Sequence, residues 1–376
     1  MIYKEFQGEQ ISALGFGTMR LPLKGKSDAD IDEELAARMF DKAIKAGVNY
    51  FDTAWGYHDH NSECVTGRIL ARYPRESFNL ASKFPGYDLG NMTKVRQIFP
   101  KQLEKCGVEY FDFYLFHNVC ELNIEAYLQH KEIYEYLLEQ KAAGRIRHLG
   151  FSAHGSCEVI ERFLDKYGAA MEFCQLQINY IDWTFQDAAR KVELLRSRGI
   201  PVWVMEPVRG GKLARLDEKY EKQLKALRPE ESIASWAFRF LTGIKDVTVI
   251  LSGMSDMAQV EDNLKTFSQD KPLDEKEREL LLGIAAEMSA RNTLPCTACR
   301  YCTSYCPKGL DIPELIKLYN EHVFTGGGFL APMAISSLAE DKRPSACIGC
   351  RSCEKVCPQG IKISEMMKKF TQALQG

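Results

Sequence analysis

The chain has 376 residues, enough for two or three domains of about 150 residues or for a barrel of about 250 residues. Hydrophobic residues make up 45% of the chain and charged residues 27%, a composition that excludes a disordered or collagen-like protein. The 49 basic and 51 acidic side chains give a net charge of −2, so we expect no nucleic-acid partner and no membrane partner. No run reaches the roughly 18 apolar residues of a membrane span, and the first residues lack a signal-peptide pattern. We therefore expect a cytoplasmic location.

Short apolar runs alternate with helical patterns between residues 10 and 255. Most of these runs are almost continuously apolar, as expected of strands that are buried on both faces. Repeated strand–helix alternation predicts parallel strands with right-handed crossovers, and eight repeats match an α/β fold of the (β/α)₈ TIM-barrel type. The expected strands are 13–17, 50–54, 78–83, 111–117, 148–153, 174–179, 202–207 and 247–253.

Helical patterns cover residues 31–46, 125–143, 186–198 and 274–290. The alternative fold is a doubly wound open sheet, which should carry a glycine-rich phosphate turn between its first strand and first helix. The segment 15–18 (Gly-Phe-Gly-Thr) lacks the third glycine and precedes a loop, so the barrel is favoured.

Eight of the 13 cysteines lie within residues 296–357, which indicates a second domain. A reducing cytosol disfavours disulfides, and dense cysteine there more often indicates a metal site. We therefore expect a barrel domain over residues 1–290 and a metal-binding domain over residues 291–376.

The clustered cysteines form two copies of the pattern C-x-x-C-x-x-C-x-x-x-C-P. Three closely spaced thiolates of such a loop wrap one 4Fe–4S cluster, and the fourth cysteine ligates the other cluster. The alternative is a pair of Cys₄ zinc sites, which usually combine two C-x-x-C pairs across a longer linker. The pattern favours two 4Fe–4S clusters, with the ligands Cys296, Cys299, Cys302, Cys306, Cys347, Cys350, Cys353 and Cys357.

This segment resembles a bacterial-type two-cluster ferredoxin. The resemblance implies crossed ligation: one cluster on Cys296, Cys299, Cys302 and Cys357, the other on Cys306, Cys347, Cys350 and Cys353. The gap between the two motifs includes a helical pattern at 312–320. We therefore expect a small, mainly α-helical ferredoxin-like iron–sulfur domain.

Polar side chains stand at the C-terminal ends of three consecutive predicted strands, where the catalytic residues of TIM barrels lie. Asp52 and Tyr57 follow the second strand, Lys83 ends the third and His117 ends the fourth. Asp52 would pair with Lys83, and Lys83 would depress the pKa of Tyr57. Tyr57 would then serve as a general acid toward a carbonyl oxygen that His117 orients. The alternative is a salt network on the barrel rim.

The pattern D-T-A-x-x-Y, with Lys and His at the next strand ends, resembles the aldo-keto reductases over about residues 1–290. The resemblance implies an oxidoreductase with the tetrad Asp52, Tyr57, Lys83 and His117, a small-molecule substrate and a nicotinamide cofactor. The predicted cofactor-binding residues are Ser152, Gln177, Arg209, Ser252, Gly253, Gln259 and Asn263.

Several positions depart from the family pattern around the cofactor. Ala153 replaces an asparagine, and Met205 stands where an aromatic ring stacks on the nicotinamide. Glu206 would oppose a pyrophosphate unless Arg209 offsets its charge. Each cluster passes one electron whereas a nicotinamide takes a hydride, and a flavin usually joins such carriers. NAD(P)H and FMN therefore both remain open.

Two functional hypotheses follow from these motifs. In the first, the barrel reduces or oxidises a carbonyl-like substrate, and two 4Fe–4S clusters exchange electrons with a barrel flavin or an external electron carrier. In the alternative, the chain is an electron-transfer or redox-sensing protein whose barrel binds FMN or docks a partner. The complete tetrad favours the first hypothesis.

Overall fold

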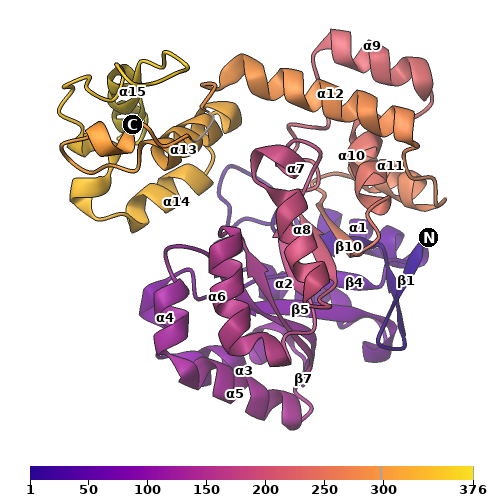
Figure 1. Cartoon of the computed structure of the whole chain (residues 1–376). Helices are drawn as coiled ribbons and strands as arrows, with labels where there is room; N and C mark the ends of the chain where they lie inside the picture. Colours follow the sequence, from indigo (N-terminus) through magenta and orange to yellow (C-terminus); the bar gives the residue numbers. More distant parts are fainter. Residues whose placement is uncertain (297–298, 376) are drawn as a thin grey trace. The chain divides into compact units, whose positions relative to one another are not determined.

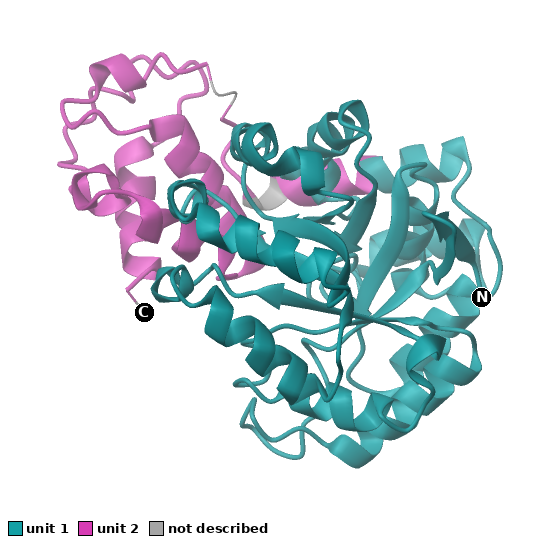
Figure 2. Ribbon diagram, turned by 90° about the horizontal axis from the view of Figure 1, so that it is seen from below, with its two compact units in different colours: residues 1–282 teal, residues 283–376 magenta. Residues whose placement is uncertain are grey.

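The computed structural model describes residues 1–296 and 299–375, and the chain divides into two compact units, Met1–Leu282 and Gly283–Gly376 (Figure 2). The boundary expected between residues 290 and 291 lies within helix α12 (Glu275–Asn292) and stays a prediction. In the described residues, every helix is too short or too polar to cross a membrane.

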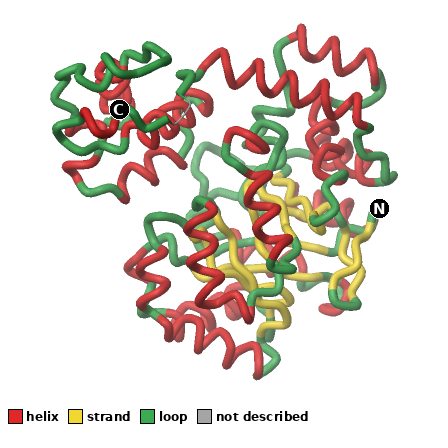
Figure 3. The backbone as a smooth tube through the Cα atoms, in the orientation of Figure 1, coloured by secondary structure: helices red, strands yellow, loops and turns green. Residues whose placement is uncertain are grey.

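The first unit is a closed barrel of parallel strands surrounded by helices, as the sequence predicts (Figure 1, Figure 3). Strand β10 pairs with strand β3 and closes the sheet, which excludes the doubly wound alternative. In β3, Gly17 lies beside Gly253 on one side and Asp52 on the other, so the strand ends that carry the predicted site meet at one rim. The barrel strands are β3 (Leu14–Gly17), β4 (Tyr50–Asp52), β5 (Asn79–Phe84), β6 (Phe111–Val119), β7 (Ile146–Ala153), β8 (Cys174–Gln177), β9 (Val202–Met205) and β10 (Val247–Gly253).

Helices follow the strands around the barrel, and the helices predicted at 31–46 and 186–198 are observed within two residues of those bounds as α1 and α8. The single helix expected over 125–143 is divided in two, because His130 leaves the helical conformation with φ −89° and ψ 65°. The helices are α1 (Glu33–Lys45), α2 (Ser62–Leu70), α3 (Val95–Cys106), α4 (Ile124–Gln129), α5 (Lys131–Ala142), α6 (Cys157–Tyr167), α7 (Asp182–Phe185), α8 (Ala188–Ser197), α9 (Glu218–Leu227), α10 (Ile233–Thr242) and α11 (Met257–Phe267).

An antiparallel hairpin of β1 (Tyr3–Phe6) and β2 (Glu9–Ser12) precedes the barrel and was not expected from the sequence. Its two-residue turn places Gln7 at φ 51° and Gly8 at φ 88°, the left-handed conformations that tight hairpins require. Phe6 packs against Trp203 inside the barrel with ring centres 5.0 Å apart. The hairpin therefore extends the buried aromatic core of the barrel.

The second unit is mainly helical, as predicted for the cysteine-rich domain. Helices α13 (Ile312–Thr325), α14 (Leu330–Ser337) and α15 (Ile363–Ala373) contribute to a small apolar core that includes two of the cysteines. The predicted helix at 312–320 continues to Thr325, where Gly326 at φ 62° ends it with a left-handed cap.

Candidate functional site

Three neighbouring strands and one loop bring the predicted tetrad together. Asp52 ends β4, Lys83 lies near the end of β5 and His117 lies in β6, while Tyr57 occupies the loop between β4 and α2. The Lys83 ammonium donates hydrogen bonds to Asp52 Oδ1 at 2.6 Å and to the Thr53 carbonyl at 2.8 Å. Its Nζ atom lies 3.5 Å from the Tyr57 hydroxyl, and the rings of Tyr57 and His117 are 6.1 Å apart. Four groups that can move or hold a proton therefore share one buried site.

The surroundings of the tetrad determine its charges. Burial raises the pKa of Tyr57 and outweighs the opposing effect of Lys83, so the expectation of a depressed phenol pKa is wrong. Burial alone would lower the pKa of Lys83, but Asp52 and Tyr57 reverse this, and the ammonium stays charged. Burial and the Lys83 charge lower the pKa of His117 well below its usual value. The site thus presents a protonated phenol, a buried cation and a neutral imidazole.

A second phenol, which the sequence reasoning missed, lies at the same site. The Tyr87 ring meets the His117 ring edge-on at 5.1 Å, and it comes from the loop after β5. A Cβ atom on Gly56 would lie 2.3 Å from the Tyr87 hydroxyl, so this hydroxyl lies against the segment that leads to Tyr57. Burial raises the pKa of Tyr87 to about 12. No spacing in the sequence marks this residue, because it belongs to an irregular loop.

The predicted cofactor residues lie on strands β7, β8 and β10, in the loop after β9 and on α11. The Ser152 hydroxyl accepts a hydrogen bond at 2.8 Å from the backbone N–H of Asn118, the residue after His117. Ser152 is therefore held beside the tetrad. The other predicted contacts follow in chain order as Gln177, Arg209, Ser252, Gly253, Gln259 and Asn263.

Asp182, which the sequence reasoning also missed, organises two of these residues. Its fully buried carboxylate accepts hydrogen bonds from Gln177 at 2.8 Å and from Asn179 at 2.6 Å. Arg209 donates to the same carboxylate at 3.1 Å and is itself almost fully buried. Gln177 and Arg209 are thus already engaged with a side chain of the protein.

Glu206 forms an ion pair with Arg20. The sequence had instead suggested Arg209 as its counterion. The distance between the Arg20 and Glu206 charged groups is 3.7 Å. Arg20 comes from the loop after β3, and its stem would lie 3.3 Å from a Cβ atom placed on Gly253. Arg20 therefore supplies a partly exposed cation at the end of β10.

Three of the predicted cofactor residues, Ser252, Gln259 and Asn263, lie in or near the first two turns of α11. The buried Ser252 hydroxyl accepts a hydrogen bond from Asn263 at 2.9 Å. Asp256 caps the helix by accepting from the Gln259 backbone at 2.8 Å, and the Gln259 amide also donates to Asp256 at 2.9 Å. A carboxylate at this cap reduces the attraction of the helix terminus for another anion.

These residues fit a nicotinamide dinucleotide along the rim. Within the described part of the chain, His117 Nδ1 is buried without a hydrogen-bond partner, which leaves a polar atom of the imidazole available to a ligand. Ser152 lies beside His117. Arg20, next to Gly253 at the end of β10, offers a cation for the phosphates of the dinucleotide. The fit is incomplete at Gln177, because Asp182 holds its amide.

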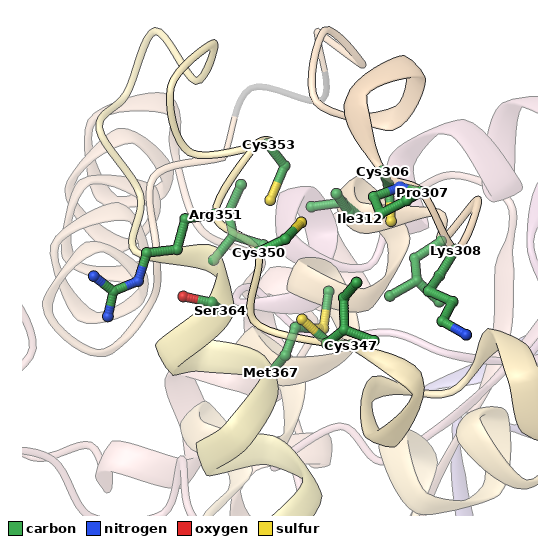
Figure 4. Close-up of a pocket in the computed structure, with 13 residues that line it drawn as sticks. Cys306, Pro307, Lys308, Ile312, Cys347, Cys350, Arg351, Cys353, Ser364 and Met367 are labelled. Atoms are coloured by element: carbon green, nitrogen blue, oxygen red, sulfur yellow. The ribbon is translucent and has the colours of Figure 1, made fainter.

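The cysteines of the second unit line two cavities, each taking three cysteines from one motif and one from the other. One cavity measures about 350 Å³ including its opening and is lined by Cys306, Cys347, Cys350 and Cys353 (Figure 4). The other measures about 320 Å³ and is lined by Cys296, Cys299, Cys302 and Cys357.

This grouping is the one that the ferredoxin resemblance implies. In residues 1–296 and 299–375, no three Cys, His, Asp or Glu side chains converge closely enough to hold a single ion. The thiols are instead distributed around cavities with apolar walls such as Ile312, Ile316 and Met367. Four thiols around a cavity fit a 4Fe–4S cluster, which is larger than a single ion.

The structure combines a TIM barrel, with the four predicted tetrad residues gathered at the C-terminal rim, and a cysteine-rich helical unit. Residues 13–284 match the Aldo/keto reductase family, and residues 295–362 match the 4Fe-4S dicluster domain. The chain therefore belongs to the aldo-keto reductase family and carries a 4Fe-4S dicluster domain.

Characterised relatives resemble the barrel at low identity. The NADH-specific methylglyoxal reductase of Escherichia coli (strain K12) is 24% identical over 304 residues, which cover 69% of this chain and 90% of the relative. The L-galactose dehydrogenase of Arabidopsis thaliana is 24% identical over 70% of this chain and 86% of its own length. The holo form of aldo-keto reductase AKR11C1 from Bacillus halodurans superposes with a TM-score of 0.62 at 24% identity, covering 76% of this chain and 96% of that one.

Proposed function

We propose that the barrel interconverts a carbonyl group and an alcohol, with a nicotinamide dinucleotide as hydride carrier. The observation that carries this proposal is the buried Lys83 ammonium, bonded to Asp52 at 2.6 Å and placed 3.5 Å from the Tyr57 hydroxyl. A cation beside a phenol favours transfer of the phenolic proton, because it stabilises the phenolate that remains.

The residues of the chain account for the proton in this reaction. When bound, a nicotinamide dinucleotide would supply or accept the hydride at the carbonyl carbon. In reduction, Tyr57 donates its proton to the carbonyl oxygen, and Lys83 stabilises the resulting phenolate. Asp52 holds Lys83 in place, and the neutral His117 donates a hydrogen bond that orients the oxygen. In oxidation, the phenolate of Tyr57 takes the proton back from the alcohol.

We propose that Ser152 and Gln177 hold the nicotinamide end, while Ser252, Gly253, Gln259 and Asn263 receive the rest of the dinucleotide. Arg209 supports this site through Asp182, and Arg20 adds a cation near the phosphates. The E. coli relative is named as NADH-specific. Because Gln259 supplies no positive charge for a 2′-phosphate, we propose that this chain also uses NADH without strong preference for NADPH. FMN finds no support among the matched proteins and is retained as the alternative.

In the second unit, we propose two 4Fe–4S clusters with the crossed ligands named above. Each cluster passes one electron at a time. We propose that they exchange electrons with an external one-electron carrier. The hypothesis of an electron-transfer or sensing protein would leave the tetrad without a chemical role.

The proposed substrate is a small carbonyl compound. Two relatives act, by their names, on methylglyoxal and L-galactose, which are both small and rich in oxygen. The test is NADH oxidation by anaerobically prepared, cluster-loaded protein with a panel of such carbonyls, beginning with methylglyoxal. We expect oxidation that depends on the carbonyl and on Tyr57. Failure of every carbonyl to oxidise NADH or NADPH would overturn the proposal.

A further inference from the structure

A partly buried ion pair lies close to the tetrad and has no part in the proposed proton transfer. Glu63, near the start of α2, has a fully buried side chain, and its Oε2 atom accepts from the Lys105 ammonium of α3 at 2.7 Å. Its Oε1 atom accepts from the Ser82 hydroxyl and from the Gln102 amide, both at 2.7 Å. Both oxygens of the carboxylate are therefore engaged by donors from β5 and α3.

These contacts attach the ion pair to the strand that carries Lys83. Ser82 directly precedes Lys83, and Gln102 also donates to the Lys83 carbonyl at 3.0 Å. The backbone on both sides of the Lys83 Cα is thus tied to groups that bind Glu63. A shift of Glu63 would therefore be transmitted to Lys83, although Glu63 is not itself part of the tetrad.

The same pair reaches the loop that carries Tyr57. The Lys105 ammonium lies 4.6 Å from the ring centre of Trp55, which stands two residues before Tyr57. Ser62, the neighbour of Glu63, has its hydroxyl 2.9 Å from that of Thr53, the residue after Asp52. The start of α2 and the end of α3 therefore hold the loop from two sides.

We infer that the Glu63–Lys105 ion pair is a positioning device that holds Tyr57 and Lys83 at their working separation. Removing two charges from water offsets much of their attraction, so stability alone gives little reason for this pair. Its contacts instead reach two segments that carry tetrad residues, β5 with Lys83 and the loop with Tyr57. The inference rests on the proposed function, because the position of Tyr57 matters only if the barrel transfers a proton.

The test compares three variants of the full, cluster-loaded chain. Lys105→Met removes the cation but keeps much of the stem, Lys105→Arg keeps a cation, and Lys101→Met is the matched control. Lys101 lies one turn earlier on α3 and pairs with Glu104 at the surface. The assay is NADH-dependent reduction of methylglyoxal, with kcat, KM and the unfolding temperature measured separately.

We expect Lys105→Met to lower kcat by roughly 10- to 100-fold, because small misplacements of reacting groups have effects of this size. The KM for NADH should stay unchanged, Lys105→Arg should restore much of kcat, and Lys101→Met should match the wild type. A Lys105→Met protein with lowered thermal stability but wild-type kcat would show a purely structural role and overturn the inference. If Lys105→Met does not fold, the double variant Glu63→Gln/Lys105→Met removes both charges together and must show the same kcat loss.

A second readout separates this inference from the proposed function. If the wild type reduces no carbonyl, the proposed function fails, but acrylamide quenching of tryptophan fluorescence still reports on Trp55. If the ion pair holds the loop that carries Trp55 and Tyr57, quenching should be stronger in Lys105→Met than in Lys101→Met. This result would support the positioning role. Equal quenching in these two variants would overturn it.

Discussion

Tyr57→Phe removes one hydroxyl from the site. Its effect on turnover can therefore be compared with its effect on the stability of the fold. The hydroxyl lies 3.5 Å from Lys83 Nζ, at the limit of a hydrogen bond, so its loss should cost at most about 1 kcal/mol of stability. Lys83 keeps its shorter bonds to Asp52 and Thr53. The unfolding temperature should therefore fall by no more than about 2–4 °C.

Turnover should respond far more strongly than stability. Loss of a general acid lowers the rate by about 10²–10⁴, or about 2.7–5.4 kcal/mol of activation free energy. The assay is steady-state carbonyl reduction by cluster-loaded protein, with Tyr87→Phe as the control because its phenol adjoins the same imidazole. Tyr87→Phe should keep wild-type turnover. The reasoning is refuted if Tyr57→Phe stays within about tenfold of the wild type, or if Tyr87→Phe shows the larger loss.

Three further predictions concern the clusters, the pH profile and the acid stability. Iron and acid-labile sulfide should each approach about eight per chain; Cys302→Ser should impair one cluster and Cys306→Ser the other, and zinc in place of iron would contradict the assignment. Because burial raises the pKa of Tyr57 above 10, its acid form persists and carbonyl reduction should not decline below pH 10; a descending limb centred at lower pH would argue against Tyr57 as the acid. Burial would raise the pKa of Glu172, but hydrogen bonds from His148 and Lys141 bring it to about 2 from 4.5. A depressed carboxyl pKa stabilises the fold above pH 4.5, and this advantage over Glu172→Gln should shrink as the pH falls toward 2 in denaturant unfolding. A pH-independent difference would exclude this origin.

The barrel was predictable because its strands are buried on both faces and carry nearly continuous apolar runs. The β1–β2 hairpin was missed because its strands have four residues each and include exposed charges such as Glu5. Its only local signal is the Gln7-Gly8 pair, and a two-residue turn signal is weak without longer alternating strands.

The tetrad was predictable because the end of a barrel strand fixes the place of a side chain. Tyr87 and Arg20 were not, because they belong to irregular segments whose course depends on tertiary packing. Asp182 was missed because it begins α7, a helix of only four residues with no periodic pattern in the sequence. The net pKa of Tyr57 was misjudged for a related reason: the charge of Lys83 is visible in the sequence, whereas the extent of burial is a property of the folded barrel.

We propose that the barrel holds a nicotinamide dinucleotide without selecting the 2′-phosphate. The most direct measurement is calorimetric titration of cofactor-stripped, cluster-loaded protein with NADH, NADPH and FMN separately. We predict that NADH and NADPH bind with affinities within about tenfold of each other, a difference below about 1.4 kcal/mol, and that FMN does not bind. Tight FMN binding without dinucleotide binding would contradict the claim, as would NADPH binding far more tightly than NADH.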